Sequence, residues 1–158
     1  MTSYERFGES YEAVMGDRRA AAEQVVELIR AAKPDAKNVL ELGCGTGSIL
    51  KCLQDAYEVS GLDISGKMLS VARKKVPRSK LFRKDMVDFR IDGRFDVIFC
   101  VFDSLNHVRR FSDWKKVFAR CTDICCQVAA SSLTSTHSGS SNASSPGHPG
   151  CIGSEGTC

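Results

Sequence analysis

The chain has 158 residues, of which 42% are hydrophobic and 26% are charged, and its formal net charge is +3. This length and composition indicate one soluble globular domain, and no apolar run reaches the ~18 residues that a membrane span needs. The N-terminus, MTSYERFGESYEAVMGDRR, is polar and carries acids, unlike a secretory signal or a transit peptide, so we expect a cytoplasmic protein. The net charge is too small to indicate a nucleic-acid or membrane partner by itself.

The composition changes near residue 120. All 22 Lys and Arg residues precede residue 121, and 19 of the 28 residues from Ser131 onward are Ser, Thr, Gly or Pro. Such a stretch buries too little apolar surface to offset the entropy lost on ordering. The sequence therefore predicts a folded domain over residues 1–120 and a disordered, Ser-, Gly- and Cys-rich tail over residues 121–158.

Cysteines are concentrated in the predicted tail, which holds five of the eight. A zinc site could be imagined from these thiols and the two tail histidines, but their spacing fits no compact zinc pattern. We expect no metal, and free reduced thiols. The residues concerned are Cys121, Cys125, Cys126, His137, His148 and Cys151.

The first two elements that the sequence predicts are helices. Aromatic and apolar residues recur at intervals of three and four from Tyr4 to Met15, which predicts a short amphipathic helix. The same spacing from Ala22 to Ile29 predicts a second helix, which ends before Pro34.

Strands and helices then alternate as far as residue 120. Ser65 is a suitable N-cap for a helix that buries Met68, Leu69, Ala72 and Val76. Near-continuous apolar strands separated by helices are typical of a parallel sheet covered on both faces. The fold class predicted is α/β, a Rossmann-like doubly wound parallel sheet. Its strands are expected at 39–42, 57–63, 79–85 and 95–101, and its other helices at 48–56 and 112–120.

Polar residues and glycines gather where the first three predicted strands end. Gly43, Gly45 and Gly47 follow the first strand, where glycine permits a positive φ and lets a ligand approach the backbone closely. Asp63 ends the second strand, the place for a carboxylate that accepts hydrogen bonds from a ribose diol. Asp85 ends the third strand. In an open parallel sheet ligands bind at this edge, so we expect a nucleoside site here.

Four short motifs resemble those of one protein family. The run VLELGCGTG differs from the dinucleotide fingerprint by its third glycine and resembles the first motif of the class I S-adenosylmethionine-dependent methyltransferases. GLDIS, KDMVDF and FDVIFCVFDSLNHV resemble their second, third and fourth motifs, in the same order. The resemblance covers residues 4 to about 120 and is nearest to small-molecule methyltransferases that dimethylate amino sugars. It implies S-adenosyl-L-methionine as cofactor and a small-molecule nitrogen or oxygen as methyl acceptor.

The resemblance also implies a role for individual residues. Glu41 orients the glycine-rich loop, and Asp63 holds the ribose hydroxyls. Asp85 accepts from the adenine amino group. The remaining expected contacts are Gly43 and Gly45 to the methionine part, Ile64, Met68 and Met86 to the adenine, and Phe102 to the sulfonium and the acceptor.

Methyl transfer needs alignment and the exclusion of water, and a base helps where the acceptor arrives protonated. His107 is the sole histidine before the tail and follows the fourth strand, so it is the candidate catalytic base; a loop histidine with local hydrogen bonds is the alternative. Asp103 and Asn106 are alternative polar groups for positioning an acceptor.

The basic run from Arg73 to Lys84 lacks interleaved aromatic residues, so a nucleic-acid partner is not expected. The sequence does not indicate an oligomeric state.

The family pattern breaks after the helix predicted at 112–120. Members of this family continue with a fifth parallel strand and a terminal hairpin, whereas this chain continues with CTDICCQVAASSLTSTHSGS. Residues 124–130 could pair as a substitute strand. The sequence thus leaves two hypotheses: a methyltransferase, or a non-catalytic, shortened form that binds the cofactor weakly or acts through protein contacts.

Overall fold

The computed structural model describes residues 18–102 and 104–128. Its strands are β1 (Asn38–Leu42), β2 (Glu58–Asp63), β3 (Lys80–Arg83), β4 (Phe95–Phe99) and β5 (Cys125–Val128). Its helices are α2 (Arg19–Ala32), α3 (Ser48–Leu53), α4 (Gly66–Lys75), the short 3₁₀ helix η2 (Ser104–His107) and α5 (Phe111–Ile124).

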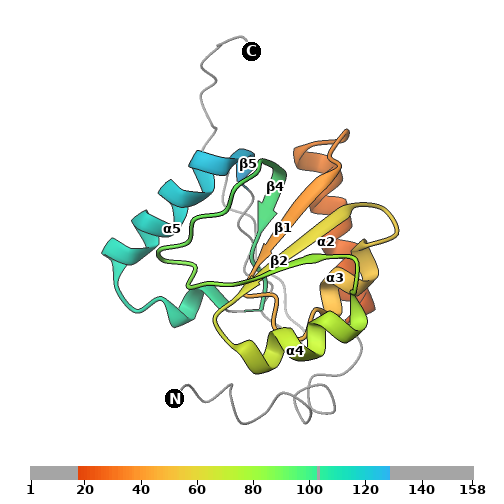
Figure 1. The fold of residues 1–158 in the computed structure, drawn as a ribbon. Helices are drawn as coiled ribbons and strands as arrows, with labels where there is room; N and C mark the ends of the chain where they lie inside the picture. The colour runs from red at the N-terminus through yellow and green to blue at the C-terminus, as the bar shows by residue number, and fades with distance from the viewer. Residues whose placement is uncertain (1–17, 103, 129–158) are drawn as a thin grey trace, which may run out of the picture.

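The five strands form one parallel sheet in the order β3-β2-β1-β4-β5. Figure 1 shows α2 and α3 on one side of this sheet and α5 on the other. This is the doubly wound α/β fold that the sequence predicts. The chain moves outward from β1 in one direction through β2 and β3, and then returns to the opposite side of β1 through β4. A ligand crevice is expected outside the carboxyl ends of β1 and β4, where the direction reverses.

Both faces of the sheet are buried, which explains the nearly continuous apolar sequence of its central strands. On one face Val39, Val59 and Val97 pack with Val25 of α2 and Leu50 of α3. On the other face Leu40, Leu62 and Ile98 pack with the loop after β3 and with α5, through residues that include Phe89, Val117 and Cys121. In the part of the chain that the structure describes, no helix is both long and apolar enough to cross a membrane.

The elements lie where the sequence predicts them, and they differ at their ends, some shorter and some longer than predicted. The helix predicted from Ala22 to Ile29 is α2, and it buries both of these residues. Ser65 is the N-cap of α4, as expected, and its side-chain oxygen accepts from the Met68 N–H at 3.3 Å. The third and fourth strands stop at Arg83 and Phe99, before the predicted ends, because the chain there leaves the sheet to form the loops at its carboxyl edge. The helix predicted from Tyr4 to Met15 lies outside the described residues.

The folded part of the chain continues past residue 120. Helix α5 extends to Ile124 because Val117 and Cys121, four positions apart, continue its buried face. Strand β5 then pairs with β4 in parallel, with Cys125 opposite Phe95, so residues 125–128 form the substitute strand anticipated for 124–130. The first eight residues of the predicted tail are therefore part of the domain, and residues 129–158 lie outside the described residues.

Gly61 in β2 offers a test of the packing that holds the edge of the site. A Cβ at this position would lie 2.6 Å from the Cys44 sulfur and 2.7 Å from Cδ1 of Leu50, both buried. Because neither neighbour has room to move, we expect Gly61→Ala to lower the free energy of unfolding by about 1–3 kcal/mol in urea denaturation followed by circular dichroism.

Gly66→Ala is the matched control. A Cβ there would meet the Arg83 guanidinium at 3.3 Å, the mobile end of an exposed side chain, and Gly66 is the first residue of α4. We expect a change within about 1 kcal/mol. Equal destabilisation by the two substitutions would contradict this account of the packing.

Candidate functional site

The candidate site is at the carboxyl edge of the sheet, around the point where the strand order reverses. Glu41 belongs to β1, and Gly43 and Gly45 follow it. Asp63 ends β2, Asp85 follows β3, and Phe102 follows β4. Because all the strands are parallel, these residues from distant parts of the sequence come together at one edge.

The glycine-rich loop after β1 curls back over the end of β2. Gly43, Gly45 and Gly47 have φ values of 72°, 53° and 73°, in the region that favours glycine. The N–H groups of Gly43 and Cys44 both donate to the Leu62 carbonyl, at 2.7 and 3.0 Å. A Cβ on Gly45 would have no atom of residues 18–102 or 104–128 within 4 Å, so among these residues the loop faces open space at its middle glycine. A ligand can approach the backbone there.

Asp63 connects this loop to helix α4. One carboxylate oxygen accepts from the Gly45 N–H and the other from the Ser65 N–H, each at 2.8 Å. Burial raises the pKa of Asp63, while backbone N–H donors, those of Ser65 and Gly45 foremost, oppose the shift. A carboxylate has about four acceptor sites, so Asp63 keeps acceptor capacity beyond its bonds to the backbone.

Glu41 is the other acid of the site, and it is 2% exposed. Its Oε2 atom is buried and has no hydrogen-bond partner among the residues that the structure describes. Burial, with the Asp63 charge as a second cause, raises the pKa of Glu41 to about 8. A buried carboxyl without a partner is costly, and the cost falls when a cationic donor reaches it. The amino group of a bound S-adenosylmethionine is such a donor, so Glu41 fits the expected cofactor.

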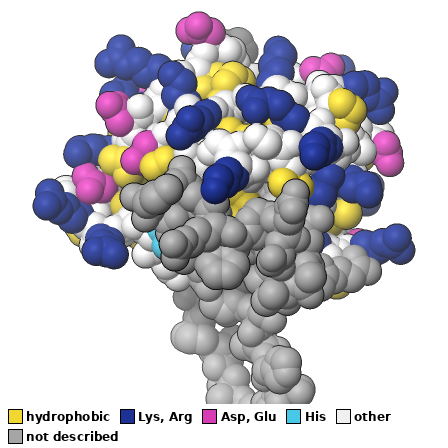
Figure 2. All heavy atoms as spheres, turned by 60° about the horizontal axis from the view of Figure 1, so that its bottom comes forward, with side chains coloured by type: hydrophobic (Ala, Val, Ile, Leu, Met, Phe, Trp, Pro, Cys, Tyr) yellow, Lys and Arg dark blue, Asp and Glu magenta, His cyan; other side chains and the backbone are white. Residues whose placement is uncertain are grey.

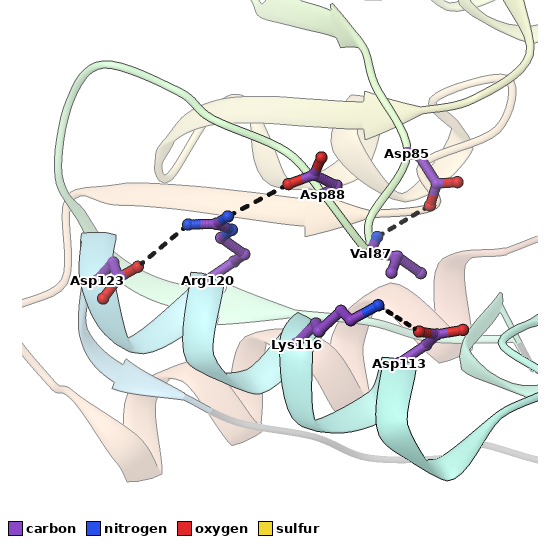
Figure 3. Close-up of polar contacts among 7 residues, drawn as sticks. All are labelled: Asp85, Val87, Asp88, Asp113, Lys116, Arg120 and Asp123. Carbon is purple, nitrogen blue, oxygen red and sulfur yellow. Dashed lines mark hydrogen bonds and ion pairs between the residues drawn. The ribbon is translucent and has the colours of Figure 1, made fainter.

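The outer wall of the site is the loop after β3. Asp85 is exposed, and one of its oxygens accepts from the Val87 N–H at 2.9 Å. Arg120 of α5 reaches the same loop through Asp88 at 3.2 Å and also lies 3.8 Å from Asp123 (Figure 3). Helix α5 therefore holds the loop that carries Asp85. The side chain of Met86 approaches the glycine loop, since its terminal carbon lies 3.5 Å from where a Cβ of Gly43 would be.

The two remaining residues expected at the adenine differ in their exposure. Ile64 is 52% exposed beside Asp63, so its side chain offers apolar surface to a ligand. Met68 is 2% exposed and packed beneath the first turn of α4. The structure brings Ile64 to the surface of the site and leaves Met68 in the interior.

The segment after β4 closes over the glycine loop. The Ser104 hydroxyl donates to the Gly43 carbonyl at 3.4 Å, and a Cβ on Gly43 would lie 2.6 Å from this side chain. Phe102 adopts a φ of 55°, the one positive φ at a non-glycine position among the described residues. His107 is exposed at the end of η2, and Asp103 lies outside the described residues.

Sequence reasoning missed three contributors. Lys75 of α4 donates to the side chains of Thr46 and Ser48, at 3.4 and 3.2 Å, and burial lowers its pKa. Ser104 contacts Gly43, as described above. The guanidinium carbon of Arg18 lies 4.0 Å from the centre of the Phe102 ring. No local sequence pattern predicts these contacts, because each joins elements that only the tertiary fold brings together.

Metal ligands are not grouped in the part of the chain that the structure describes. No three His, Cys, Asp or Glu side chains there are placed to hold a metal ion. The described cysteines, which are Cys44, Cys52, Cys100, Cys121 and Cys125, are free thiols.

Residues 39–127, more than half of the chain, match the family model described as a methyltransferase domain. A dTDP-3-amino-3,6-dideoxy-alpha-D-glucopyranose N,N-dimethyltransferase of Streptomyces fradiae is 37% identical over 58% of this chain and 36% of its own length. A putative methyltransferase of Bacillus subtilis, YqeM, is 33% identical over 73% of this chain and 48% of its own length. The chain thus spans less than half the length of these two relatives.

Solved structures agree with this assignment. The amino pentose methyltransferase CalS10 of Micromonospora echinaspora, bound to S-adenosylmethionine, superposes with a TM-score of 0.70 at 28% identity, covering 82% of this chain and 56% of that one. DesVI of Streptomyces venezuelae superposes with a TM-score of 0.71 at 25% identity, over 82% of this chain and 57% of that one. With its Rossmann-like sheet and its glycine-rich loop at the carboxyl edge, the chain belongs to the methyltransferase domain family.

Proposed function

We propose that this chain binds S-adenosyl-L-methionine at the carboxyl edge of its sheet and transfers the methyl group to a nitrogen atom of a small molecule. The observation that carries the proposal is the buried, unpartnered Oε2 atom of Glu41 beside the open glycine loop. The relatives support the choice of acceptor, since several are named as N,N-dimethyltransferases of amino sugars.

The described residues can hold each part of this cofactor. The remaining acceptor capacity of Asp63 suits the two hydroxyls of a ribose. The open space at Gly45 admits the methionine part, and the Glu41 carboxylate receives its amino group. Ile64 and the loop of Asp85 border the adenine. When bound, S-adenosylmethionine supplies a methyl group that its sulfonium already activates.

Two tasks then remain for the protein, alignment of the acceptor and removal of its proton. An amine that arrives protonated has no lone pair for attack, so a base must take the proton first. His107, exposed on the segment that closes over Gly43, is the proposed base. Phe102 borders the acceptor at the end of β4.

We also propose a cytoplasmic location, consistent with the free thiols of the described cysteines.

A second candidate function is cofactor binding without catalysis. The chain spans 36% and 48% of the length of the two relatives described above. Calorimetry with S-adenosylhomocysteine, followed by a product assay over a panel of amino sugars and other amines, separates the two. Binding with turnover supports the methyltransferase, and binding without turnover on any acceptor supports the second candidate.

Asp63→Asn tests the ribose contact. The amide keeps one oxygen but presents an N–H₂ group where the carboxylate accepted, so we expect S-adenosylhomocysteine to bind about 10- to 100-fold more weakly, equivalent to roughly 1–3 kcal/mol. The measurement is isothermal titration calorimetry at a temperature where the variant is folded. Asp92→Asn, in an exposed turn away from the site, is the control and should bind like wild type. Unchanged affinity in Asp63→Asn would remove Asp63 from the cofactor site.

The raised pKa of Glu41 should make the stability of the protein depend on pH. Its pKa of about 8 in the folded protein exceeds its ordinary value of 4.5, so between these limits the folded state holds a proton that the unfolded chain releases. The stability from this group is present at low pH and is lost as the pH rises toward 8. We expect thermal denaturation to show wild type losing about 3–4 kcal/mol of unfolding free energy between pH 5 and 8 relative to Glu41→Gln.

Bound cofactor should weaken this pH dependence of stability if its amino group faces Glu41. A cation beside the carboxyl favours the charged form, so saturation with S-adenosylhomocysteine should flatten the wild-type curve. Parallel pH curves for wild type and Glu41→Gln in the free protein would show that Glu41 does not titrate as described.

His107→Ala tests the base. Loss of a general base should lower the turnover number about 100-fold or more at neutral pH while leaving the affinity for S-adenosylhomocysteine within about twofold. Steady-state kinetics and calorimetry on the same preparation measure the two quantities. His107→Gln keeps a polar side chain of similar reach and should be equally slow; full activity in either variant would leave His107 without a catalytic role.

A further inference from the structure

Arg18 and Phe102 meet at the carboxyl edge although they are far apart in the sequence. Arg18 immediately precedes α2, and Phe102 follows β4. The guanidinium carbon lies 4.0 Å from the centre of the Phe102 ring, the distance of a cation–π contact. Arg18 is half-buried by this packing. The arginine is therefore held in one place instead of extending into solvent.

The charge of Arg18 is not matched by an acid in the part of the chain that the structure describes. None of the ion pairs among those residues includes it, and the first turn of α2 contains no acidic residue. The N–H groups of a guanidinium lie in its own plane, so a guanidinium whose face contacts an aromatic ring can still donate from its edge. Those N–H groups match the two oxygens of a carboxylate or a phosphate.

The backbone of Phe102 indicates that this arrangement is imposed by the fold. Its φ of 55° costs a bulky residue energy and persists only where the surroundings fix it. Two residues later Ser104 contacts Gly43, so the segment is fastened to the glycine loop. Strained residues of this kind cluster at ligand sites, and this one sets an aromatic ring beneath a guanidinium.

The order of the strands places the pair beside the acceptor. The cofactor contacts proposed above come from the ends of β3, β2 and β1, and β4 is the next strand in the sheet. A group at the end of β4 therefore lies beyond the methionine part, on the side from which an acceptor must come. Phe102, which has this position, is the residue expected to border both the sulfonium and the acceptor.

We propose that Arg18, held on the ring of Phe102, binds a phosphate or carboxylate group of the methyl acceptor. The inference rests on the proposed function, because it takes the site at β1–β3 as the place of the methyl donor. It makes the acceptor an amine that also carries an anionic group. Such a group would dock on the guanidinium and hold the nitrogen near the methyl group.

The first experiment titrates the full chain, saturated with S-adenosylhomocysteine, with inorganic phosphate and separately with acetate. NMR follows the Arg18 Nε–H signal, which is assigned by its absence from the spectrum of Arg18→Gln. We expect a saturable shift with at least one anion, and at least tenfold weaker binding of that anion in Arg18→Gln, measured for both proteins by isothermal titration calorimetry. Phe102→Leu, which removes the ring, should also weaken it. Absence of a saturable shift at Arg18 with both anions overturns the proposal.

Arg30→Gln is the matched control. Arg30 lies on the same helix, is exposed, and stands at the opposite end of α2. We expect the anion affinity of this variant to equal that of wild type. An equal loss in Arg30→Gln and Arg18→Gln would mean that only the net charge matters, which contradicts a defined subsite.

The second experiment excludes the carboxylate of the cofactor as the natural partner of Arg18. Binding of S-adenosylhomocysteine is compared with binding of methylthioadenosine, which lacks the amino acid part, in wild type and Arg18→Gln. We expect the substitution to change both affinities less than twofold. A tenfold loss for S-adenosylhomocysteine alone would assign Arg18 to the donor and overturn the proposal.

Failure of the proposed function gives a different result. If wild type does not bind S-adenosylhomocysteine, the donor site is wrong, and phosphate titration of the free chain still reports on Arg18. If the cofactor binds and the Arg18 signal does not respond to either anion, the donor site stands and the subsite is wrong.

Discussion

The site depends on one carboxylate that serves two segments. Asp63 accepts at 2.8 Å from Gly45 in the loop after β1 and at 2.8 Å from Ser65 at the start of α4. These segments approach each other because β1 and β2 are parallel neighbours whose carboxyl ends meet. The hydrogen bonds fix the curled loop, and the loop in turn leaves the open space at Gly45 that a ligand can enter. Asp63, proposed above as a ribose contact, is therefore also the main connection between the two segments.

The same carboxylate contributes to the titration of its neighbour. Two acids lie close together here, and backbone N–H groups donate to Asp63, which lowers its pKa against the effect of burial. Burial raises the pKa of Glu41 to about 8, with the Asp63 charge as a second cause, and no donor among the described residues reaches its Oε2 atom. Environments that separate the pKa values of paired acids are a recurring feature of active sites. At neutral pH Glu41 is therefore mostly protonated in the free site, and a cation that binds beside it favours its charged form.

Local signals predicted most of the fold, and tertiary contacts account for what they missed. The glycines, the apolar strands and the Ser65 cap are each specified by residues next to one another, so the sequence shows them. The loss of charged residues after residue 120 suggested the end of the domain, but burial of Cys121 and the pairing of β5 depend on an apolar face, not on charge. Helical spacing also predicted correctly that α4 buries Met68, and the adenine contact that the resemblance implies for this residue stays a prediction.

The groups proposed for the donor and for the acceptor differ in where they lie relative to the shared domain. The matched region, residues 39–127, contains the donor groups proposed at Glu41, Asp63 and Asp85, and also Phe102 and His107 on the acceptor side. Arg18 precedes this region, and it reaches the site only because α2 begins at the carboxyl edge beside Phe102. Acceptors differ from one relative to another, so a residue that selects among them can lie outside the shared part. An arginine brought in from outside the matched region, onto a strained aromatic residue at its edge, has the position expected of a group that distinguishes one acceptor from another.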